Sequence, residues 1–88
     1  MISLKERSII QKIARRYRVK RVLLFGSSLY KKTARDIDLA VEGVPDKDFF
    51  SFYGDLLFAL PKPVDLVDLS RDSKFTRLVR QEGFAIYG

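Results

Sequence analysis

A short apolar run that leads into a strand with two alternating aspartates constrains the fold of this chain most strongly. Residues 22–25 are Val-Leu-Leu-Phe, which is the pattern of a strand covered on both faces. A second strand is predicted for residues 35–42, where Asp36 and Asp38 flank an isoleucine. Because successive strand side chains point to opposite faces, both carboxylates lie on one face and the apolar side chains on the other. The sequence therefore predicts a sheet with an acidic pair beside its core.

The connection between these two strands begins with Gly26, Ser27 and Ser28. Glycine lets the backbone turn and approach a ligand closely, because it has no Cβ. A short helix is predicted for residues 27–32, and the free N–H groups at its start form a phosphate cradle together with a serine hydroxyl. A glycine–serine turn alone is common, but one followed shortly by Asp-x-Asp on a new strand is specific.

A third carboxylate is predicted in the strand at residues 64–69, which contains Asp65 and Asp68. An unpaired charge inside an apolar run is costly to bury, so Asp65 needs a partner. Asp65 is therefore either a neighbour of Asp36 and Asp38 or a member of a structural salt bridge. Asp68 falls on the opposite face and suits a turn. Clustered carboxylates repel one another unless a cation lies between them, and a divalent cation is the usual one.

Two residue types that build many active sites are missing, because the chain has no cysteine and no histidine. Disulfides, thiolate sites, imidazole bases and Ser-His-Asp catalysis are thereby excluded. A metal would be bound through oxygen, which favours Mg²⁺, with Mn²⁺ as an alternative. The net charge of +6 suits a polyanionic partner such as a nucleotide or RNA, and it also favours solubility. The sequence shows no membrane helix and no signal-peptide pattern, so a cytoplasmic location is expected.

The remaining segments alternate between helix and strand patterns. A capping box at Ser3 and Glu6 starts a helix whose apolar residues recur at helical spacing. Asp46 is expected to cap a second helix, and Gly83 to end the last helix in the left-handed conformation. The predicted helices are residues 3–18, 46–60 and 70–82, and the further strands are 64–69 and 84–87. The prediction is an α/β (α+β) fold, with a small mixed sheet and packed helices, in a single domain over residues 1–88.

Two surfaces have alternative interpretations. The aromatic residues of the helix at 46–60 exceed one apolar stripe, so most are expected in the core and Phe52 or Phe58 on a partner surface. A basic cluster is either a solvated face or a site for RNA, phosphate or an acidic partner. Its members are Lys12, Arg15, Arg16, Arg18, Lys20 and Arg21.

The last helix is expected to contribute to the core. The residues expected to face inward from it are Phe75, Leu78 and Val79.

The segment Gly26-Ser27 followed by Asp36-Ile37-Asp38 resembles the signature of the polymerase beta-like nucleotidyltransferases. The end of the chain has a helix, a glycine and a short strand that closes in Tyr-Gly, which is similar to the end of the minimal nucleotidyltransferase (MNT) domains of bacteria and archaea. The resemblance covers the whole chain. MNT domains are often encoded beside a HEPN-domain partner as a toxin–antitoxin pair.

This resemblance implies the polymerase beta-like fold and a Mg²⁺-dependent enzyme that transfers AMP from ATP to a hydroxyl group of a partner macromolecule. It implies that Asp36 and Asp38 hold two metal ions, and that Asp65 holds the ion nearer the acceptor and helps to remove the acceptor's proton. The implied acceptor is a HEPN-type toxin, with RNA as the second choice. The implied nucleotide-binding residues, at the β- and γ-phosphates, are Gly26, Ser27 and Ser28.

Two other functions stay open. Residues 28–32 depart from the family's usual pattern, and Arg35 stands where its cation can pair with Asp36. The altered segment and the aromatic helix motivate the alternative, an MNT-fold binding module that neutralises its partner by contact, with weak or no catalysis. A small basic RNA-binding protein is the third alternative, but the chain lacks the aromatic-interleaved motif of such proteins.

Overall fold

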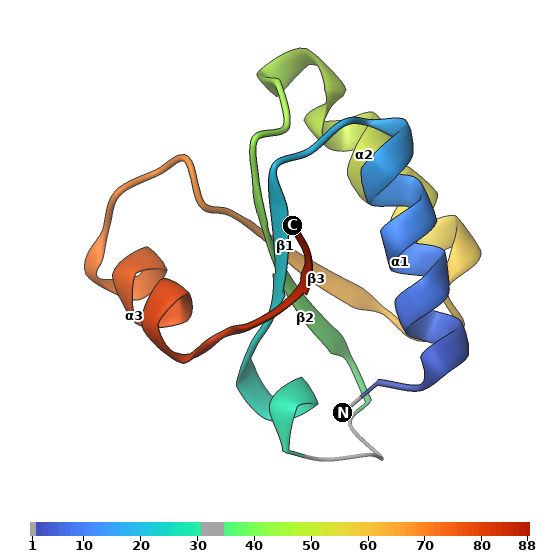
Figure 1. Cartoon of the computed structure of the whole chain (residues 1–88), viewed down its shortest axis with the longest axis horizontal. Coiled ribbons are helices and arrows are strands. Elements are labelled where there is room, and N and C mark those ends of the chain that lie inside the picture. The colour runs from blue at the N-terminus through green and yellow to red at the C-terminus, as the bar shows by residue number, and fades with distance from the viewer. Residues whose placement is uncertain (1, 31–34) are drawn as a thin grey trace.

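The described part of the chain is built on one four-stranded mixed sheet. The computed structural model describes residues 2–30 and 35–88 (Figure 1). The strands are β1 (Arg21–Leu24), β2 (Ile37–Glu42), β3 (Val64–Asp68) and β4 (Phe84–Tyr87). Their order is β3-β2-β1-β4, with β1 antiparallel to β2 and β4 and with β2 parallel to β3. This arrangement confirms the predicted α+β fold with a small mixed sheet.

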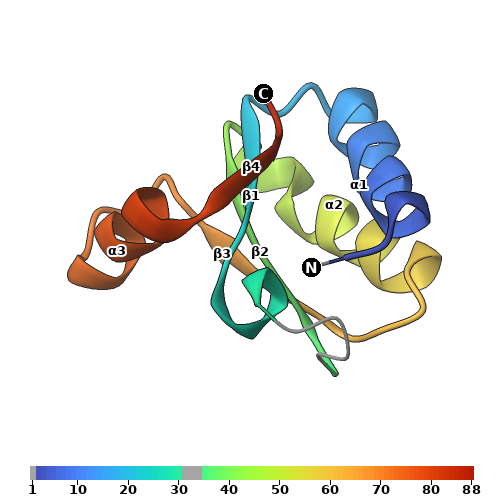
Figure 2. The same cartoon turned by 60° about the horizontal axis from the view of Figure 1, so that its bottom comes forward.

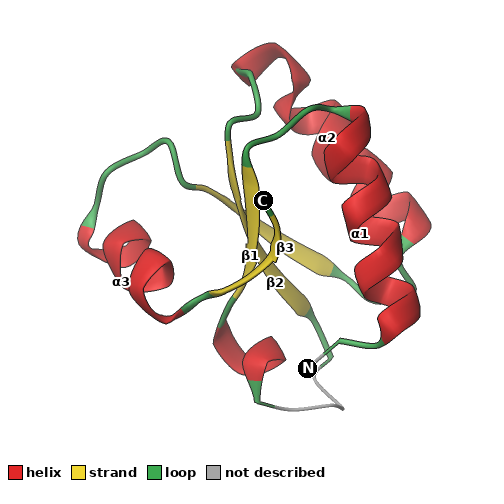
Figure 3. Ribbon diagram, viewed as in Figure 1, coloured by secondary structure: helices red, strands yellow, loops and turns green. Residues whose placement is uncertain are grey.

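Helices cover the two faces of the sheet unequally. The helices α1 (Leu4–Arg16) and α2 (Asp46–Ala59) pack against each other on one face, and α3 (Lys74–Glu82) lies alone on the other (Figures 1 and 2). A short 3-10 helix, η1 (Gly26–Leu29), follows β1 and lies at the end of the sheet (Figure 3). No helix among residues 2–30 and 35–88 is long and apolar enough to cross a membrane.

Alternation along β2 divides its side chains between two apolar clusters. Ile37, Leu39 and Val41 belong to the large cluster under α1 and α2, and Ala40 belongs to a small cluster that also contains Val79 of α3. Residues of the same parity share a face of a strand, so the carboxylate-bearing positions of β2 lie on the α3 side. The face with the smaller core is therefore the face that carries the acidic side chains.

The helix starts follow from their capping residues. The Ser3 hydroxyl accepts from the Glu6 N–H at 3.1 Å and the Glu6 carboxylate accepts from the Ser3 N–H at 2.9 Å, which is the predicted capping box. A second capping box, between Ser73 and Thr76, starts α3 a little later than the sequence predicted. The prediction that Asp46 caps α2 is wrong. Asp46 is the first residue of the helix, and no side chain caps the start of α2.

Three further local predictions were wrong in whole or in part. Gly83 has a φ of −68° because β4 follows α3 at once, so the chain leaves the helix in an extended rather than a left-handed conformation. Phe52 is buried against the Tyr17 ring, whereas Phe58 is 94% exposed as predicted. The last helix buries Val79 but leaves its two largest apolar residues about half exposed, because α3 meets the sheet along a narrow stripe.

Candidate active site

Two of the predicted site aspartates lie directly opposite each other on neighbouring strands. Asp38 on β2 and Asp65 on β3 are Cα partners in the parallel ladder. Asp36 lies two residues before Asp38, just ahead of the first residue of β2, and its charge acts on Asp38. The structure thus sets Asp38 and Asp65 opposite each other, with Asp36 near enough for its charge to act on Asp38. Asp68 is not among them, and its carboxylate accepts from the Ser70 N–H at 2.9 Å as a turn partner.

The electrostatics of this cluster are those of crowded like charges. Burial raises the pKa of Asp38, and the negative charges of Asp65 and Asp36 raise it further. A hydrogen bond with the Asp65 carboxylate, available only to a protonated Asp38, also raises that pKa, while the Ser27 backbone N–H donates to Asp38 and lowers it. The folded chain therefore holds a carboxylate whose charge is destabilised by its neighbours.

Gly26 brings the backbone after β1 against the Asp38 carboxylate. Its φ is +67°, a conformation that residues with a Cβ rarely adopt. An ideal Cβ at this position would lie 2.6 Å from Asp38 Oδ2, which is closer than a real contact allows. The turn thus needs glycine both for its backbone angle and for the space beside the carboxylate.

Ser28 fastens this turn to the start of β2. Its side chain is 2% exposed, donates to the Asp36 carbonyl oxygen at 3.0 Å and accepts from the Asp38 N–H at 2.9 Å. These two bonds set the backbone that carries both aspartates. The Ser27 side chain is exposed beside them. Contact of Gly26, Ser27 and Ser28 with a nucleotide stays a prediction.

The donor set of the cluster suits a hard divalent cation, because every side-chain donor in it is a carboxylate oxygen. Burial is the main cause that raises the pKa of Asp38 and the charges of Asp65 and Asp36 raise it further, so a cation beside Asp38 would favour its ionised form. As the side chains lie, no three Asp or Glu side chains within residues 2–30 and 35–88 stand close enough to hold a metal ion. The residues therefore match such an ion in chemistry and charge, but their side chains as placed do not form a metal site.

The cations singled out in the sequence lie in different places. Arg35 is exposed, and Lys31 and Lys32 fall outside the described residues. Lys12, Arg15, Arg16 and Arg18 are exposed on and after α1, as a solvated face requires. Lys20 and Arg21 instead form ion pairs with Glu42. The distances are 3.8 Å from Lys20 Nζ to Glu42 Oε2 and 3.9 Å from Arg21 Nη1 to Glu42 Oε1.

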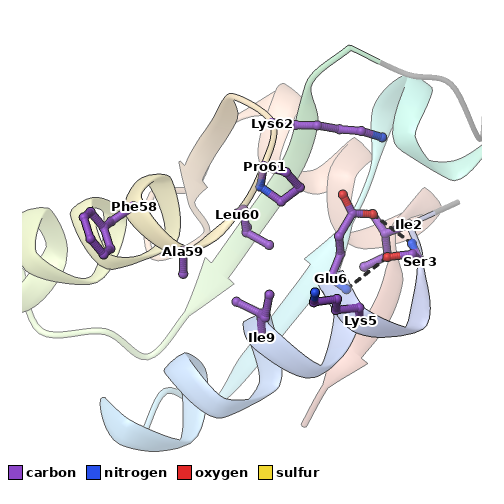
Figure 4. Close-up of a pocket in the computed structure, with 10 residues that line it drawn as sticks. All are labelled: Ile2, Ser3, Lys5, Glu6, Ile9, Phe58, Ala59, Leu60, Pro61 and Lys62. Carbon is purple, nitrogen blue, oxygen red and sulfur yellow. Dashed lines mark hydrogen bonds between the residues drawn. The ribbon is translucent and has the colours of Figure 1, made fainter.

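Two pockets differ in their relation to the carboxylates. A pocket of about 710 Å³ lies between the N-terminal end of α1 and the C-terminal end of α2, with Ile9, Leu60 and Pro61 among its apolar walls (Figure 4). None of the predicted site residues lines it. A smaller pocket of about 210 Å³ lies between α3 and the end of β1, and Gly26 is part of its wall.

Sequence reasoning missed the residues of α3 that line the smaller pocket, which are Phe75, Leu78, Val79 and Glu82. It assigned the first three to the core. A signal was present, because positions 75, 78 and 82 are spaced to share one side of a helix. Nothing in the local pattern connected that side with the glycine–serine turn, which lies far away in the sequence.

Comparison with known proteins agrees with this geometry. The family model described as polymerase beta, nucleotidyltransferase matches residues 8–88. The solved toxin–antitoxin structure MntA–HepT contains a chain that is 26% identical, with a TM-score of 0.74, over 98% of this chain and 73% of that one. No curated protein sequence is similar enough to this chain to count as a match.

Two further solved structures contain a bound nucleotide analogue or an AMP-modified partner. A toxin–antitoxin structure with AMP-PNP is similar at 27% identity and a TM-score of 0.72, over 93% of this chain and 73% of that one. The second is the structure of a tri-AMPylated Shewanella oneidensis HEPN toxin in complex with an MNT antitoxin. It contains a chain that is 27% identical to this one, with a TM-score of 0.72, over 96% of this chain and 71% of the matched chain.

Proposed function

This chain belongs to the polymerase beta nucleotidyltransferase family, and on that premise we propose that it transfers AMP from ATP to a hydroxyl group of a HEPN-type toxin and so acts as an antitoxin. The neighbours described as MntA–HepT and as an MNT antitoxin with a tri-AMPylated HEPN toxin support the partner and the modification. The neighbour with AMP-PNP supports an adenine nucleotide as the donor. The toxin would supply the acceptor.

In the proposed reaction, an acceptor hydroxyl oxygen attacks the α-phosphorus of ATP. A new P–O bond forms, the bond between the α-phosphorus and the bridging oxygen to the β-phosphorus breaks, and pyrophosphate leaves with the electron pair. The acceptor proton passes to a carboxylate, and Asp65 is the candidate because its side chain is exposed and open to an acceptor on another molecule. Phosphoryl-type transfer relies mainly on positioning and charge, which this site is able to supply.

The remaining site residues would position the nucleotide. Gly26 allows the triphosphate to approach the backbone, and Ser27 offers an exposed hydroxyl beside it. The buried Ser28 hydroxyl would act indirectly, by keeping Asp36 and Asp38 in register with the turn. The single observation that carries the proposal is the opposition of Asp38 and Asp65 on the α3 face of the sheet, with the Gly26 turn against the Asp38 carboxylate.

Nucleotidyltransferase domains of this family generally use divalent metals, and we propose Mg²⁺, as two ions, with Mn²⁺ as an alternative. Asp36, Asp38 and Asp65 are the residues that would hold it. The chemistry that bound Mg²⁺ supplies is neutralisation of phosphate charge and activation of the acceptor hydroxyl. RNA is a less favoured acceptor, because the exposed basic residues of α1 lie on the helix that covers the opposite face of the sheet.

The decisive experiment incubates the purified chain with a purified HEPN-domain toxin, with ATP labelled at the α-phosphate and with Mg²⁺. We expect label on the toxin, a mass increase of one or more AMP groups, and release of pyrophosphate. Asp38→Asn should abolish all three, while Asp68→Asn, on the other face of β3, should retain them. If Asp38→Asn neutralises the toxin as well as the wild type and no label transfers, the chain acts by covering its partner.

A further inference from the structure

The pocket between α1 and α2 continues along α1 into a second one. The first, drawn in Figure 4, has a volume of about 710 Å³ and the second about 340 Å³. Ile9, Phe58 and Ala59 line both, so the two form one continuous surface, the α1–α2 groove. It lies on the face of the sheet opposite Asp38 and Asp65. We propose that this groove binds an acidic amphipathic helix of a protein partner, and this inference does not depend on the proposed function.

The floor of the groove is apolar and open to solvent. Phe58 is 94% exposed, Ala59 and Pro61 are exposed beside it, and Ile9 is half-buried. Full burial of a phenylalanine side chain is worth about 1.5–3 kcal/mol, so a partner that covers this ring gains appreciable affinity. Contiguous apolar surface of this kind on a small protein is typical of a contact site.

The rim of the groove is positively charged. Four cations line it, and they are Lys5, Lys12, Arg16 and Lys62. The two carboxylates in the lining already have partners within the chain. Glu6 is buried in its capping box with Ser3, and Asp55 accepts from the Tyr17 hydroxyl at 2.7 Å and pairs with Arg16 at 3.4 Å. Among residues 2–30 and 35–88, no carboxylate lies within ion-pair distance of the three lysines. An acidic partner would supply the missing charges.

The spacing along α1 fits a helix. The groove residues of α1 include positions 5, 9, 12 and 16, which are separated by four, three and four residues and therefore share one side of the helix. They span about 17 Å, or roughly three turns. Helix-in-groove recognition uses apolar anchors at this same spacing, over a similar length. An amphipathic helix with acidic residues beside its apolar side would match both the floor and the rim.

Two other occupants suit the groove less well. In a symmetric dimer built on this groove, the cations of one copy would face the cations of the other, and each chain carries a net charge of +6. Single-stranded RNA would satisfy the cations, but it binds by stacking bases on aromatic side chains. Phe58 is the one aromatic residue in the described lining of the groove.

The test measures fluorescence anisotropy of labelled helical peptides of about 14 residues, or four turns, titrated with the full chain. The probe has leucines on one side of the helix and glutamates on the other. One comparison peptide has the same composition with the leucines spread around the helix, and the other has lysines in place of the glutamates. Wild type should bind the probe at least about tenfold more tightly than either, and added salt should weaken binding.

Matched variants locate the binding surface. Phe58→Ala should weaken binding of the probe by about tenfold, because the ring is the largest exposed apolar group of the groove. Phe50→Ala is the control, since Phe50 is 82% exposed on the same helix and does not line the groove. Lys12→Glu should weaken binding by about threefold, in line with an exposed ion pair, and Lys74→Glu at the start of α3 should not. Melting curves confirm that each variant folds.

The opposing outcomes are distinct. Equal binding of the three peptides, no binding, or unchanged binding by folded Phe58→Ala overturns the inference. An oligouridine that binds more tightly than the probe and displaces it assigns the groove to RNA, and a dimer in sedimentation that Phe58→Ala dissociates assigns it to a second copy. Asp38→Asn and MgATP should leave probe binding unchanged, because the groove and the carboxylates lie on opposite faces of the sheet. A failure of AMP transfer therefore leaves the groove standing, and a failure of the groove leaves the proposed function standing.

Discussion

Asp38 and Asp65 occupy opposed positions on two parallel strands, so their carboxylates share one face of the sheet. Strand neighbours in this relationship are close enough for like charges to destabilise each other. Burial, together with the charges of Asp65 and Asp36, raises the pKa of Asp38. Such crowding is costly to a fold without a ligand, and it is a frequent property of functional sites.

The first prediction concerns the stability of the metal-free chain. Because the pKa of Asp38 is raised in the folded state, its stabilising contribution is fully present below its ordinary pKa of 3.8 and is lost as the pH rises through the raised pKa. Asp38→Asn should therefore melt at a higher temperature than wild type near neutral pH in EDTA, and the difference should vanish at strongly acidic pH. Melting curves by circular dichroism across this pH range measure it.

The control for this variant is Asp68→Asn, since Asp68 lies on the opposite face of β3 and bonds to the Ser70 N–H. It should show no gain in melting temperature. Equal melting of Asp38→Asn and wild type near neutral pH would mean that neither burial nor the neighbouring carboxylates destabilise the Asp38 charge.

The second prediction compares two glycines. Gly26→Ala places a Cβ 2.6 Å from Asp38 Oδ2 and requires a non-glycine residue at a φ of +67°. The left-handed backbone alone costs about 1–2 kcal/mol, so both stability and nucleotide binding should fall. Gly54→Ala in α2 has open space around it and should raise the free energy of unfolding by about 0.5–1 kcal/mol. Urea unfolding measures both variants, and a stable, active Gly26→Ala would contradict the close approach.

The third prediction separates the two serines of the turn. Ser28→Ala leaves the buried Asp38 N–H and the Asp36 carbonyl without their partner, which should cost about 1–3 kcal/mol of stability. Ser27→Ala removes an exposed hydroxyl and should leave stability nearly unchanged while it weakens MgATP binding. Chemical denaturation and titration of the same two variants test this division of roles. The interpretation fails if Ser28→Ala is as stable as wild type.

The fourth prediction concerns the attachment of α3 to the sheet. Glu42 accepts from Arg80 at 3.2 Å, and Arg80 also donates to the Leu69 carbonyl oxygen at 2.9 Å. The hydrogen bond from Arg80 is the main cause that lowers the pKa of Glu42, against the effect of burial, and the charges of Arg80, Lys20 and Arg21 lower it further. The contribution of this carboxylate is present above its ordinary pKa of 4.5 and is lost as the pH falls through the lowered pKa.

Glu42→Gln should therefore destabilise the chain by about 1 kcal/mol near neutral pH and by less in acid, as thermal melts at two pH values will show. Asp72→Asn breaks the pair between Asp72 and Arg77, in which both side chains are largely exposed, and should change the melting temperature little. Equal effects of the two substitutions at neutral pH would argue against a special role for Glu42.

Much of the chemistry was readable from consecutive residues. The alternation in the apolar run predicted that Asp38 lies on the face of β2 opposite Ile37 and Leu39, and the missing cysteine and histidine restricted any metal to oxygen ligands. The capping box at Ser3 and the apolar runs located the helices and strands to within a few residues. These features are local, because backbone geometry alone decides which neighbours in the sequence share a face or satisfy a helix end.

The tertiary structure decided what depends on contact between distant segments. The helix α2 is apolar around much of its circumference, so only its packing showed that Phe52 is buried and Phe58 is exposed. The parallel register of β2 and β3 set Asp65 opposite Asp38, and the return of the chain through α3 placed Phe75 beside the Gly26 turn. The sequence by itself thus determined the elements and the acidic pair, whereas the third carboxylate's position and the pocket required the fold, because strand register and helix docking are set by packing between segments that no local pattern relates.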